Sequence, residues 1–362
     1  MKKLYIILAV IVVVLGSSLT LFFQSLNSES KNEKTTITVF CADSLMFSLQ
    51  RIIDSFESQT PSIKVEMEGH GSIQVIRHVT ELGYKVDLCM VADYSLIPIM
   101  MYNTTIPTTN QSFANWYIRF AGNRIVLAYT NHSKYADQIN SSNWYKILAK
   151  SDVTFGFPNP MIDALGYRVL ITIQLAEDYY NDNQIFDRLI YDNFNPHFSS
   201  IQINSKYIVT VPEVQTPVGD KVRLRSSGIQ LIPLLESGSI DYSFLYLSQA
   251  KQQGFSFVEL PPELNLESPQ YQEVYSKIRV RFEQQRFASI SLDQDGKAIY
   301  YGLTIPKNAP QREAATKFVE FILSEKGQEI FNSTWFPIFQ PSLTDNINNI
   351  PEILHQFTSV EH

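Results

Sequence analysis

One pattern dominates the first third of the chain: a short β-rich run, a polar turn and an amphipathic helical stripe, repeated three times. The turns carry serine, aspartate or glycine, residues that favour helix starts and tight turns. Successive strand–helix units of this kind build parallel sheets through right-handed crossovers. The pattern therefore predicts an α/β fold with a parallel, doubly wound sheet. The three units comprise residues 36–56, 63–82 and 86–101.

Alternating strands and helices continue to about residue 335, with a hairpin or extended insertion expected over 181–220 and one long helix from Pro310 through Ile330. The chain has 362 residues, which suits two lobes of about 100–200 residues and an appendage. The predicted organisation is an anchor and tether at 1–35, the first part of lobe 1 at 36–130, lobe 2 at 131–249, the return of lobe 1 with the hinge at 250–345, and a C-terminal tail at 346–362.

Residues 4–28 carry no charge and follow Lys2 and Lys3. A bilayer needs about 20 apolar residues, and flanking lysines favour the cytoplasmic side. This segment is therefore predicted to be a membrane anchor that holds the remainder on the extracytoplasmic face, with residues 24–35 as a tether. A cleaved signal peptide is the alternative, although the segment has no clear small-x-small cleavage site.

Composition excludes some functions. The net charge of −7 disfavours nucleic-acid binding, because phosphate contacts need clustered Lys and Arg. The chain has no GxSxG elbow, Walker A loop or Cys-x-x-Cys pair, and His70 and His78 lack zinc spacing, so no enzyme is predicted. Cys41 and Cys89 lie in apolar runs and read as two buried thiols, with a disulfide left open should their strands be neighbours.

Candidate binding residues lie where predicted strands give way to helices: Ser44, Ser72, Asp163 and the segment 226–228. A helix amino terminus offers unpaired N–H groups and a partial positive charge, so it can hold an oxyanion without a cationic side chain. Each residue can equally be a simple helix cap. Tyr246 is either core or ligand contact, and Asp93 with Tyr94 either shapes a cleft wall or serves the turn.

Several segments closely resemble the molybdate/tungstate-binding proteins of archaeal-type ABC transporters: 39–45, 71–72, 92–94, 144–148, 155–160 with Asp163 and 166–168, 235–242 and 301–309. The resemblance implies a two-lobed, type II periplasmic-binding-protein fold that closes over an oxyanion in a cleft between the lobes. It also implies ABC permease subunits as partners and no cofactor. The implied ligand-binding residues are Asp43, Ser44, Ser72, Asp163, Ala164, Leu165, Gly228 and Tyr246.

The sequence departs from this family at the site. The family usually has Gly where Asp43 stands and Glu where Gly228 stands, and that Glu with the counterpart of Asp163 completes an octahedral shell around the oxyanion's metal centre. Ala164 and Leu165 replace a Pro-Cys pair. These departures predict that the bound anion stays tetrahedral and that Gly228→Glu strengthens tungstate binding relative to sulfate. Asp43 either compensates for the missing glutamate or, as its place at a helix start favours, caps its own helix. A sulfate or phosphate receptor, or a degenerate surface sensor, remains the alternative.

Overall fold

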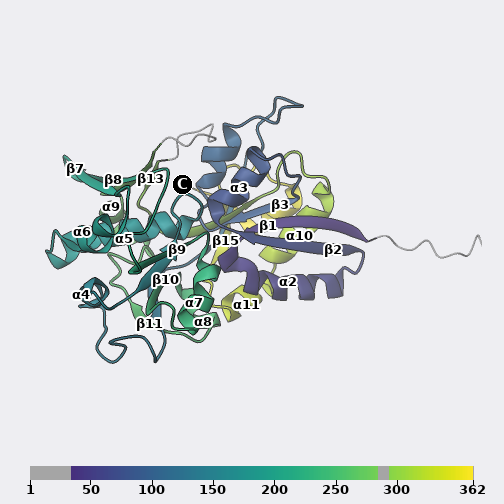
Figure 1. Ribbon diagram of the computed structural model, residues 1–362. Coiled ribbons are helices and arrows are strands. Elements are labelled where there is room, and N and C mark those ends of the chain that lie inside the picture. The colour runs from purple at the N-terminus through teal and green to yellow at the C-terminus, as the bar shows by residue number, and fades with distance from the viewer. Residues whose placement is uncertain (1–33, 284–292, 362) are drawn as a thin grey trace, which may run out of the picture.

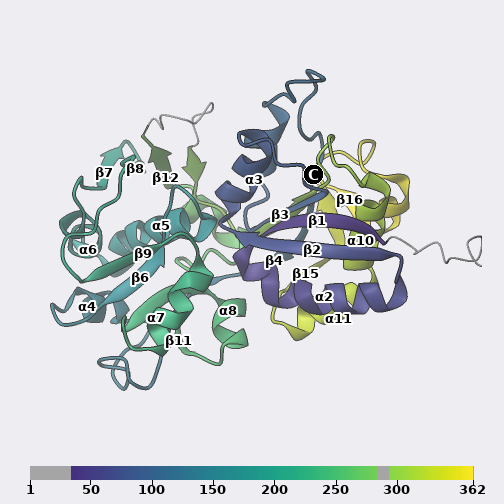
Figure 2. The same cartoon turned by 45° about the vertical axis from the view of Figure 1, so that its right-hand side comes forward.

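A computed structural model describes residues 34–283 and 293–361. The predicted anchor at residues 4–28 lies outside these ranges. Among the described residues, no helix has the length and apolar character needed to cross a membrane. The described chain forms two lobes, each built around β-sheet (Figures 1 and 2).

The first lobe contains a seven-stranded sheet in the order β16-β15-β4-β14-β3-β1-β2. Strand β1 runs parallel to β2 and β3, as the repeated βα units predict, whereas β14 is antiparallel to both β3 and β4. The predicted all-parallel sheet is therefore wrong beyond its first three strands. The strands are β1 (Thr35–Ala42), β2 (Ile63–His70), β3 (Leu88–Val91), β4 (Ile118–Gly122), β14 (Tyr300–Thr304), β15 (Ile338–Thr344) and β16 (Thr358–Val360).

Amphipathic helices cover this sheet, because their apolar stripes must be buried. Helix α2 (Met46–Gln59) buries Leu49, Ile52, Ile53 and Phe56, and α3 (Ser72–Thr80) buries Ile73, Val75, Ile76 and Val79. The long helix predicted over 310–330 is two helices, α10 (Arg312–Leu323) and α11 (Glu325–Ser333). Ser324 has an extended backbone, and its hydroxyl accepts a hydrogen bond from the Gly327 N–H, so a helix cap divides the periodic stripe.

The second lobe holds a five-stranded sheet in the order β11-β5-β10-β6-β9 and a four-stranded sheet in the order β13-β12-β8-β7. Its strands are β5 (Ile125–Tyr129), β6 (Phe155–Pro158), β7 (Ser199–Ile203), β8 (Lys206–Val211), β9 (Val222–Arg225), β10 (Tyr242–Tyr246), β11 (Ser256–Glu259), β12 (Ile278–Phe282) and β13 (Gln294–Asp295). Its helices are α4 (Trp144–Ala149), α5 (Ala164–Tyr180), α6 (Ile185–Leu189), α7 (Ile232–Glu236), α8 (Leu247–Gln252) and α9 (Gln272–Tyr275). The antiparallel pair β7–β8 is the hairpin expected within 181–220.

Strand pairing moves the predicted lobe boundaries. Strand β5 falls within 36–130 but pairs with β10 and β11 of the second lobe, and β11 to β13 fall within the predicted return at 250–345. Residues 346–362 are more than a tail, because β16 pairs with β15. Hydrophobic periodicity identifies a strand but not the sheet it joins, so these boundaries could not be drawn from pattern alone. The chain crosses between the lobes at 123–124 and again at 296–299.

The two cysteines lie on neighbouring strands, with Phe40 of β1 paired to Cys89 of β3 and Cys41 next along β1. Both thiols are free and fully buried, which confirms the prediction of two buried thiols. Burial raises the pKa of the Cys89 thiol to about 12, so this group stays protonated and behaves as a small apolar side chain.

Candidate functional site

The predicted site residues come together where the two lobes touch. They follow the carboxyl ends of strands: Asp43 and Ser44 after β1, Asp163 to Leu165 after β6, Gly228 after β9, and Tyr246 at the end of β10. This edge is where open α/β sheets bind ligands. All eight are buried, the charged Asp43 being only 6% exposed and Asp163 3%.

Backbone groups join the lobes around Asp163. The N–H groups of Ile73 and Gln74, in the first turn of α3, both donate to the carbonyl oxygen of Ile162, at 3.0 and 3.3 Å. Gly71, which precedes α3, lies so close that a Cβ built on it would be 2.6 Å from that oxygen and 3.1 Å from Cβ of Asp163. A side chain at position 71 would push the lobes apart, so glycine permits this approach.

Asp43 has partners in both lobes. Its carboxylate accepts from the Ser44 backbone N–H at its own helix start, and Oδ2 accepts a 2.6 Å hydrogen bond from the backbone N–H of Ile229, in the opposite lobe. The Ser227 hydroxyl also donates to this carboxylate. Asp43 therefore reaches the segment 227–229, where the resemblance places the family's glutamate. A second buried carboxylate therefore lies at this junction, supplied by the first lobe.

Two hydroxyl groups at this junction, those of Ser72 and Tyr246, retain a proton to donate. Ser72 Oγ accepts from the Ala92 N–H at 2.9 Å, and Tyr246 Oη accepts from Arg168 Nη1 at 2.6 Å. Ser44 Oγ lies 2.9 Å from Tyr301 Oη, whose other partner, Asn123 Nδ2, is a donor. Either hydroxyl of the Ser44–Tyr301 pair can be the donor, because each carries one proton and two lone pairs. Ser72 and Tyr246 are thus oriented by N–H donors behind them and keep their own protons, and the Ser44 hydroxyl is held by Tyr301.

The two carboxylates form an electrostatically coupled pair. Burial raises the pKa of Asp43, and hydrogen bonds from Ile229 and Ser227 offset part of the shift. Burial also raises the pKa of Asp163 well above its usual range, and the charge of Asp43 adds to it. Asp163 Oδ1 caps α5 by accepting from the Leu165 N–H at 2.8 Å, which confirms its predicted capping role. Two like charges buried together favour a bound proton when no ligand is present.

A buried charge cluster behind these residues was not predicted from the sequence. Asp93, Arg168 and Tyr167 are each at most 1% exposed, and Lys297 Nζ lies 3.4 Å from Asp93 Oδ2. Arg168 stands alone as a charged side chain on the apolar stretch 164–176 of α5. A lone charge in a buried helix must be paired, so this contrast is the signal that could have identified the cluster.

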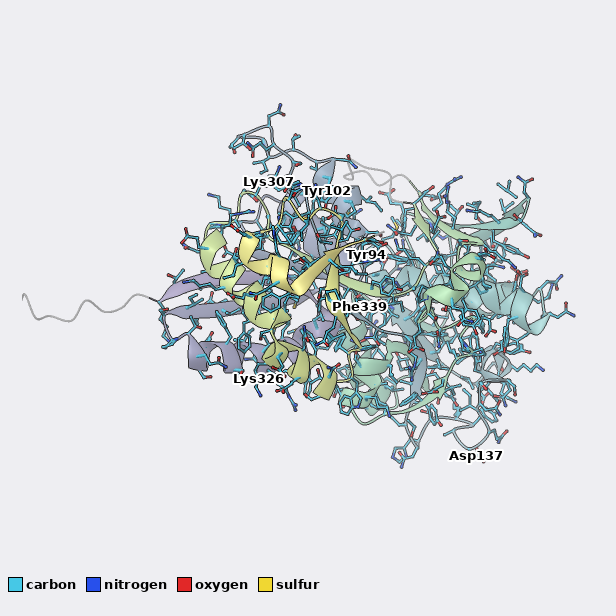
Figure 3. The ribbon with its side chains drawn as sticks, turned by 180° about the vertical axis from the view of Figure 1, so that it is seen from behind. Tyr94, Tyr102, Asp137, Lys307, Lys326 and Phe339 are labelled. Carbon is cyan, nitrogen blue, oxygen red and sulfur yellow. The ribbon has the colours of Figure 1, made fainter. Side chains whose placement is uncertain are left out.

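Asp93 and Tyr94 take different directions from the same turn. Asp93 Oδ1 accepts from the N–H and the hydroxyl of Ser95, so it serves the turn as well as the lobe junction. The Tyr94 ring packs 5.1 Å from the ring of Tyr117 and under the guanidinium of Arg119. Figure 3, drawn from behind, shows Tyr94 near Phe339 within the first lobe. Tyr94 therefore packs within that lobe, and Asp93 is the member of the pair that reaches the junction.

Comparison with known proteins gives relatives that span almost the whole chain. Residues 37–336 match the family model described as bacterial extracellular solute-binding protein. The molybdate/tungstate-binding protein WtpA of Thermococcus kodakarensis is 33% identical over 97% of this chain and 96% of its own. WtpA of Pyrococcus abyssi is 37% identical over 90% of both chains. An uncharacterised solute-binding protein of Staphylothermus marinus is 35% identical over 99% of this chain and 97% of its own.

Solved structures share the fold. The periplasmic molybdate-binding protein of Azotobacter vinelandii superposes with a TM-score of 0.54 at 14% identity, covering 84% of this chain and all of its own. The sulfate-binding protein SubI of Mycobacterium tuberculosis gives a TM-score of 0.52 at 15% identity, covering 84% of this chain and 87% of its own. At such identities the likeness concerns the fold, a mixed α/β architecture of the periplasmic-binding-protein type.

Proposed function

Because this chain belongs to the family of bacterial extracellular solute-binding proteins, we propose that it captures molybdate or tungstate between its two lobes and delivers the anion to an ABC permease. The WtpA relatives, whose names state molybdate and tungstate as ligands, support this choice of anion. The protein acts by binding and release, with no chemical step. The site is formed by the eight residues described above, divided between the lobes as a type II binding protein requires.

The donors at the junction suit a tetrahedral oxygen shell. Ser72 and Tyr246 each retain a hydroxyl proton, Ser44 adds a third hydroxyl, and the starts of α3 and α5 lie next to each other. Hydroxyl and amide donors bind oxyanions without a formal positive charge, so a protein with a net charge of −7 can still hold an anion. The donors come from both lobes, so an anion bound to all of them favours lobe closure.

The observation that carries the choice of metal oxyanion is the buried carboxylate pair, Asp43 from one lobe and Asp163 from the other. A carboxylate beside sulfate adds only repulsion, since the sulfur accepts no further oxygen ligand. A high-valent molybdenum or tungsten centre does accept additional oxygen ligands. The pair therefore supports molybdate or tungstate over sulfate, with Asp43 in place of the family's glutamate, and a bound centre with more than four oxygens.

An anion panel tests the function. Wild-type protein is heated with tungstate, molybdate, sulfate or phosphate at several concentrations, and a true ligand raises the melting temperature with the logarithm of its concentration. Tungstate and molybdate should stabilise at micromolar concentrations, and sulfate should need far more. X-ray absorption of the tungstate complex should show six oxygens around the metal. Preferential stabilisation by sulfate or phosphate assigns the site to another oxyanion, and no stabilisation by any of them points to a sensor or interaction protein.

Moving the second carboxylate from position 43 in the first lobe to position 228 in the second lobe should preserve tungstate binding. The sequence alone predicts that Gly228→Glu strengthens tungstate binding and that the anion stays tetrahedral. With Asp43 beside position 228 we propose the reverse: Gly228→Glu alone should weaken tungstate binding about tenfold or more, because it puts a third carboxylate beside Asp43 and Asp163. A Cβ at position 228 would also lie 3.2 Å from the amide atoms of Gln249. Asp43→Gly alone should weaken tungstate binding by removing the second carboxylate. The double variant should recover binding, measured by calorimetry, because it restores two carboxylates in the family's arrangement.

Gly228→Gln is the matched control, since it has nearly the same shape without the charge. It should not recover tungstate binding when combined with Asp43→Gly. Additive losses in the Asp43→Gly, Gly228→Glu double variant would show that the two positions do not serve the same ligand, and the assignment of Asp43 would be wrong.

We place the protein on the extracytoplasmic face of the cell membrane, held by residues 4–28. The extracellular family supports that side of the membrane. Amino-terminal sequencing of protein purified from its native membrane should read a start at or near Met1. A mature start between Ser25 and Thr35 would instead identify a cleaved signal peptide and a released protein.

A further inference from the structure

Two sequence segments matched in the resemblance have no role in the proposed anion contacts: 92–94 after β3 and 166–168 in the first turns of α5. The structure brings them together from opposite lobes. Tyr167 Oη donates to Asp93 Oδ2 at 2.6 Å, and Arg168 Nη1 donates to the Ala92 carbonyl oxygen at 2.8 Å. Arg168 Nη2 lies 3.4 Å from the same Asp93 oxygen, with both side chains at most 2% exposed.

Arg168 also contacts the proposed anion site. The same Nη1 group that holds the Ala92 carbonyl donates to Tyr246 Oη. Tyr246 therefore has an acceptor lone pair occupied from behind and its single proton free for the ligand. Ala92 makes a second link, because its N–H donates to Ser72 Oγ. One guanidinium thus connects the first-lobe segment that orients Ser72 to the second-lobe hydroxyl of Tyr246.

The position of Arg168 along α5 also brings it near Asp163, another residue of the proposed anion site. It lies five residues after Asp163, which caps the helix, and its charge offsets part of the rise that burial causes in the pKa of that carboxyl. Gly166 lets the helix start pack tightly, since a Cβ there would lie 2.4 Å from the Pro158 carbonyl oxygen and 2.6 Å from Pro160 N. The guanidinium is therefore held on a rigid element, and its planar fork of five N–H donors can serve several acceptors at once. A lysine has the charge but not this fork.

We infer that Arg168 is a positioning residue that couples anion contact to lobe closure: it orients the Tyr246 hydroxyl toward the ligand while it grips Ala92 and Asp93 of the opposite lobe. Arg168 does not itself touch the anion. The inference rests on the proposed function, because it gives the oxyanion site a means of transmitting occupancy to the arrangement of the lobes. It assigns a role to the Asp93–Arg168 ion pair beyond stability.

A double-mutant cycle with sodium tungstate tests the connection to Tyr246. Arg168→Lys should weaken binding about 10- to 100-fold in the wild-type background, the range expected when hydrogen bonds to a charged group are lost. In the Tyr246→Phe background, Arg168→Lys should weaken tungstate binding by at most a third of the factor seen in the wild-type background. The reason is that the Tyr246 hydroxyl, which Arg168 orients, is absent. Arg279→Lys is the matched control: Arg279 of β12 pairs with Asp295 of β13, so this substitution should leave binding unchanged.

Solution scattering tests the connection to closure. At saturating tungstate the wild-type protein should become more compact, whereas Arg168→Lys should remain nearer the dimensions of its unliganded form. If Arg168→Lys does not fold, Arg168→Met combined with Asp93→Asn removes both charges of the pair together and takes its place. The readouts are unchanged: weakened binding and loss of compaction.

Equal losses from Arg168→Lys in both backgrounds, together with wild-type compaction, would overturn the inference while leaving the proposed function intact. Wild-type protein that neither binds nor responds to tungstate would refute the proposed function, and the inference would fall with it. These two results are distinguished by the wild-type measurement alone.

Discussion

Asp93→Ala should lower the free energy of unfolding by about 3–5 kcal/mol, the loss expected when one partner of a buried ion pair is removed. Asp93 is fully buried between two cations, Arg168 and Lys297, and accepts from Tyr167 and Ser95 as well. Its removal leaves the guanidinium of Arg168 without a counter-charge in a site closed to water. Urea unfolding followed by circular dichroism measures the change.

Asp54→Ala is the matched control for this substitution. Asp54 is an exposed aspartate on α2, bonded only through the Gln50 side chain among the described hydrogen bonds, so its loss should change stability by less than about 0.5 kcal/mol. A loss at Asp93 no larger than the loss at Asp54 would contradict the buried cluster.

The stability contributed by Asp93 should disappear in acid. Burial alone would raise the pKa of this carboxyl, but Lys297 and Arg168 hold it well below its usual range. A carboxyl with a depressed pKa stabilises the fold at pH values above the unfolded pKa of about 3.9, and that contribution is lost as pH falls through the folded value. The difference between wild type and Asp93→Ala should therefore narrow below about pH 4.

The ligand-free protein should lose stability as pH rises through the range in which Asp43 and Asp163 ionise. Burial raises the pKa of both groups, and Asp43 raises that of Asp163 further, so the folded state binds more protons than the unfolded chain. Their contribution is complete below about pH 4 and declines as pH rises through the folded values, by at most about 1.4 kcal/mol per pH unit for each proton released.

Asp43→Asn isolates this effect, because the amide cannot ionise and keeps almost the same shape. Between pH 5 and pH 9 its unfolding free energy should fall less steeply than that of wild type, and Asp54→Asn should follow the wild type. Parallel slopes for Asp43→Asn and wild type would mean that the two carboxyls are not coupled. Saturating tungstate should also flatten the wild-type slope if the metal centre takes both carboxylates as ligands.

Local signals in the sequence located most of the groups that meet at the junction of the lobes. The cap at Asp163, the start of α3 at Ser72 and the turn after β1 are set by neighbouring residues, so their positions follow from pattern and capping preference. The partners of these groups are not local. Asp43 contacts Ile229, 186 residues away, and Tyr246 contacts Arg168, 78 residues away. No periodicity records such contacts, which is why the contact of Asp43 with the second lobe was not predicted.

The seven-stranded sheet shows the same difference between local signals and long-range contacts. Alternation in the first units predicted the parallel pairing of β1 with its two neighbours, since a helix links each strand to the next. Strand β14 joins the first sheet antiparallel to β3, after the chain has passed through the whole second lobe. No residue within 300–304 specifies the direction of this strand. Strand direction depends on how the intervening chain is folded, so it became visible only in the structure.

The crossings at 123–124 and 296–299 make the second lobe an insertion into the first. Strands β4 and β14, which bracket it, are hydrogen-bonded neighbours with Tyr300 opposite Gly122, so the chain leaves and re-enters the first lobe at almost the same point. Adjacent strands lie about 4.8 Å apart. A short turn from Gly122 to Tyr300 would close the first lobe as a continuous chain. Both connections therefore lie side by side, and any change in the angle between the lobes is absorbed by these two short segments.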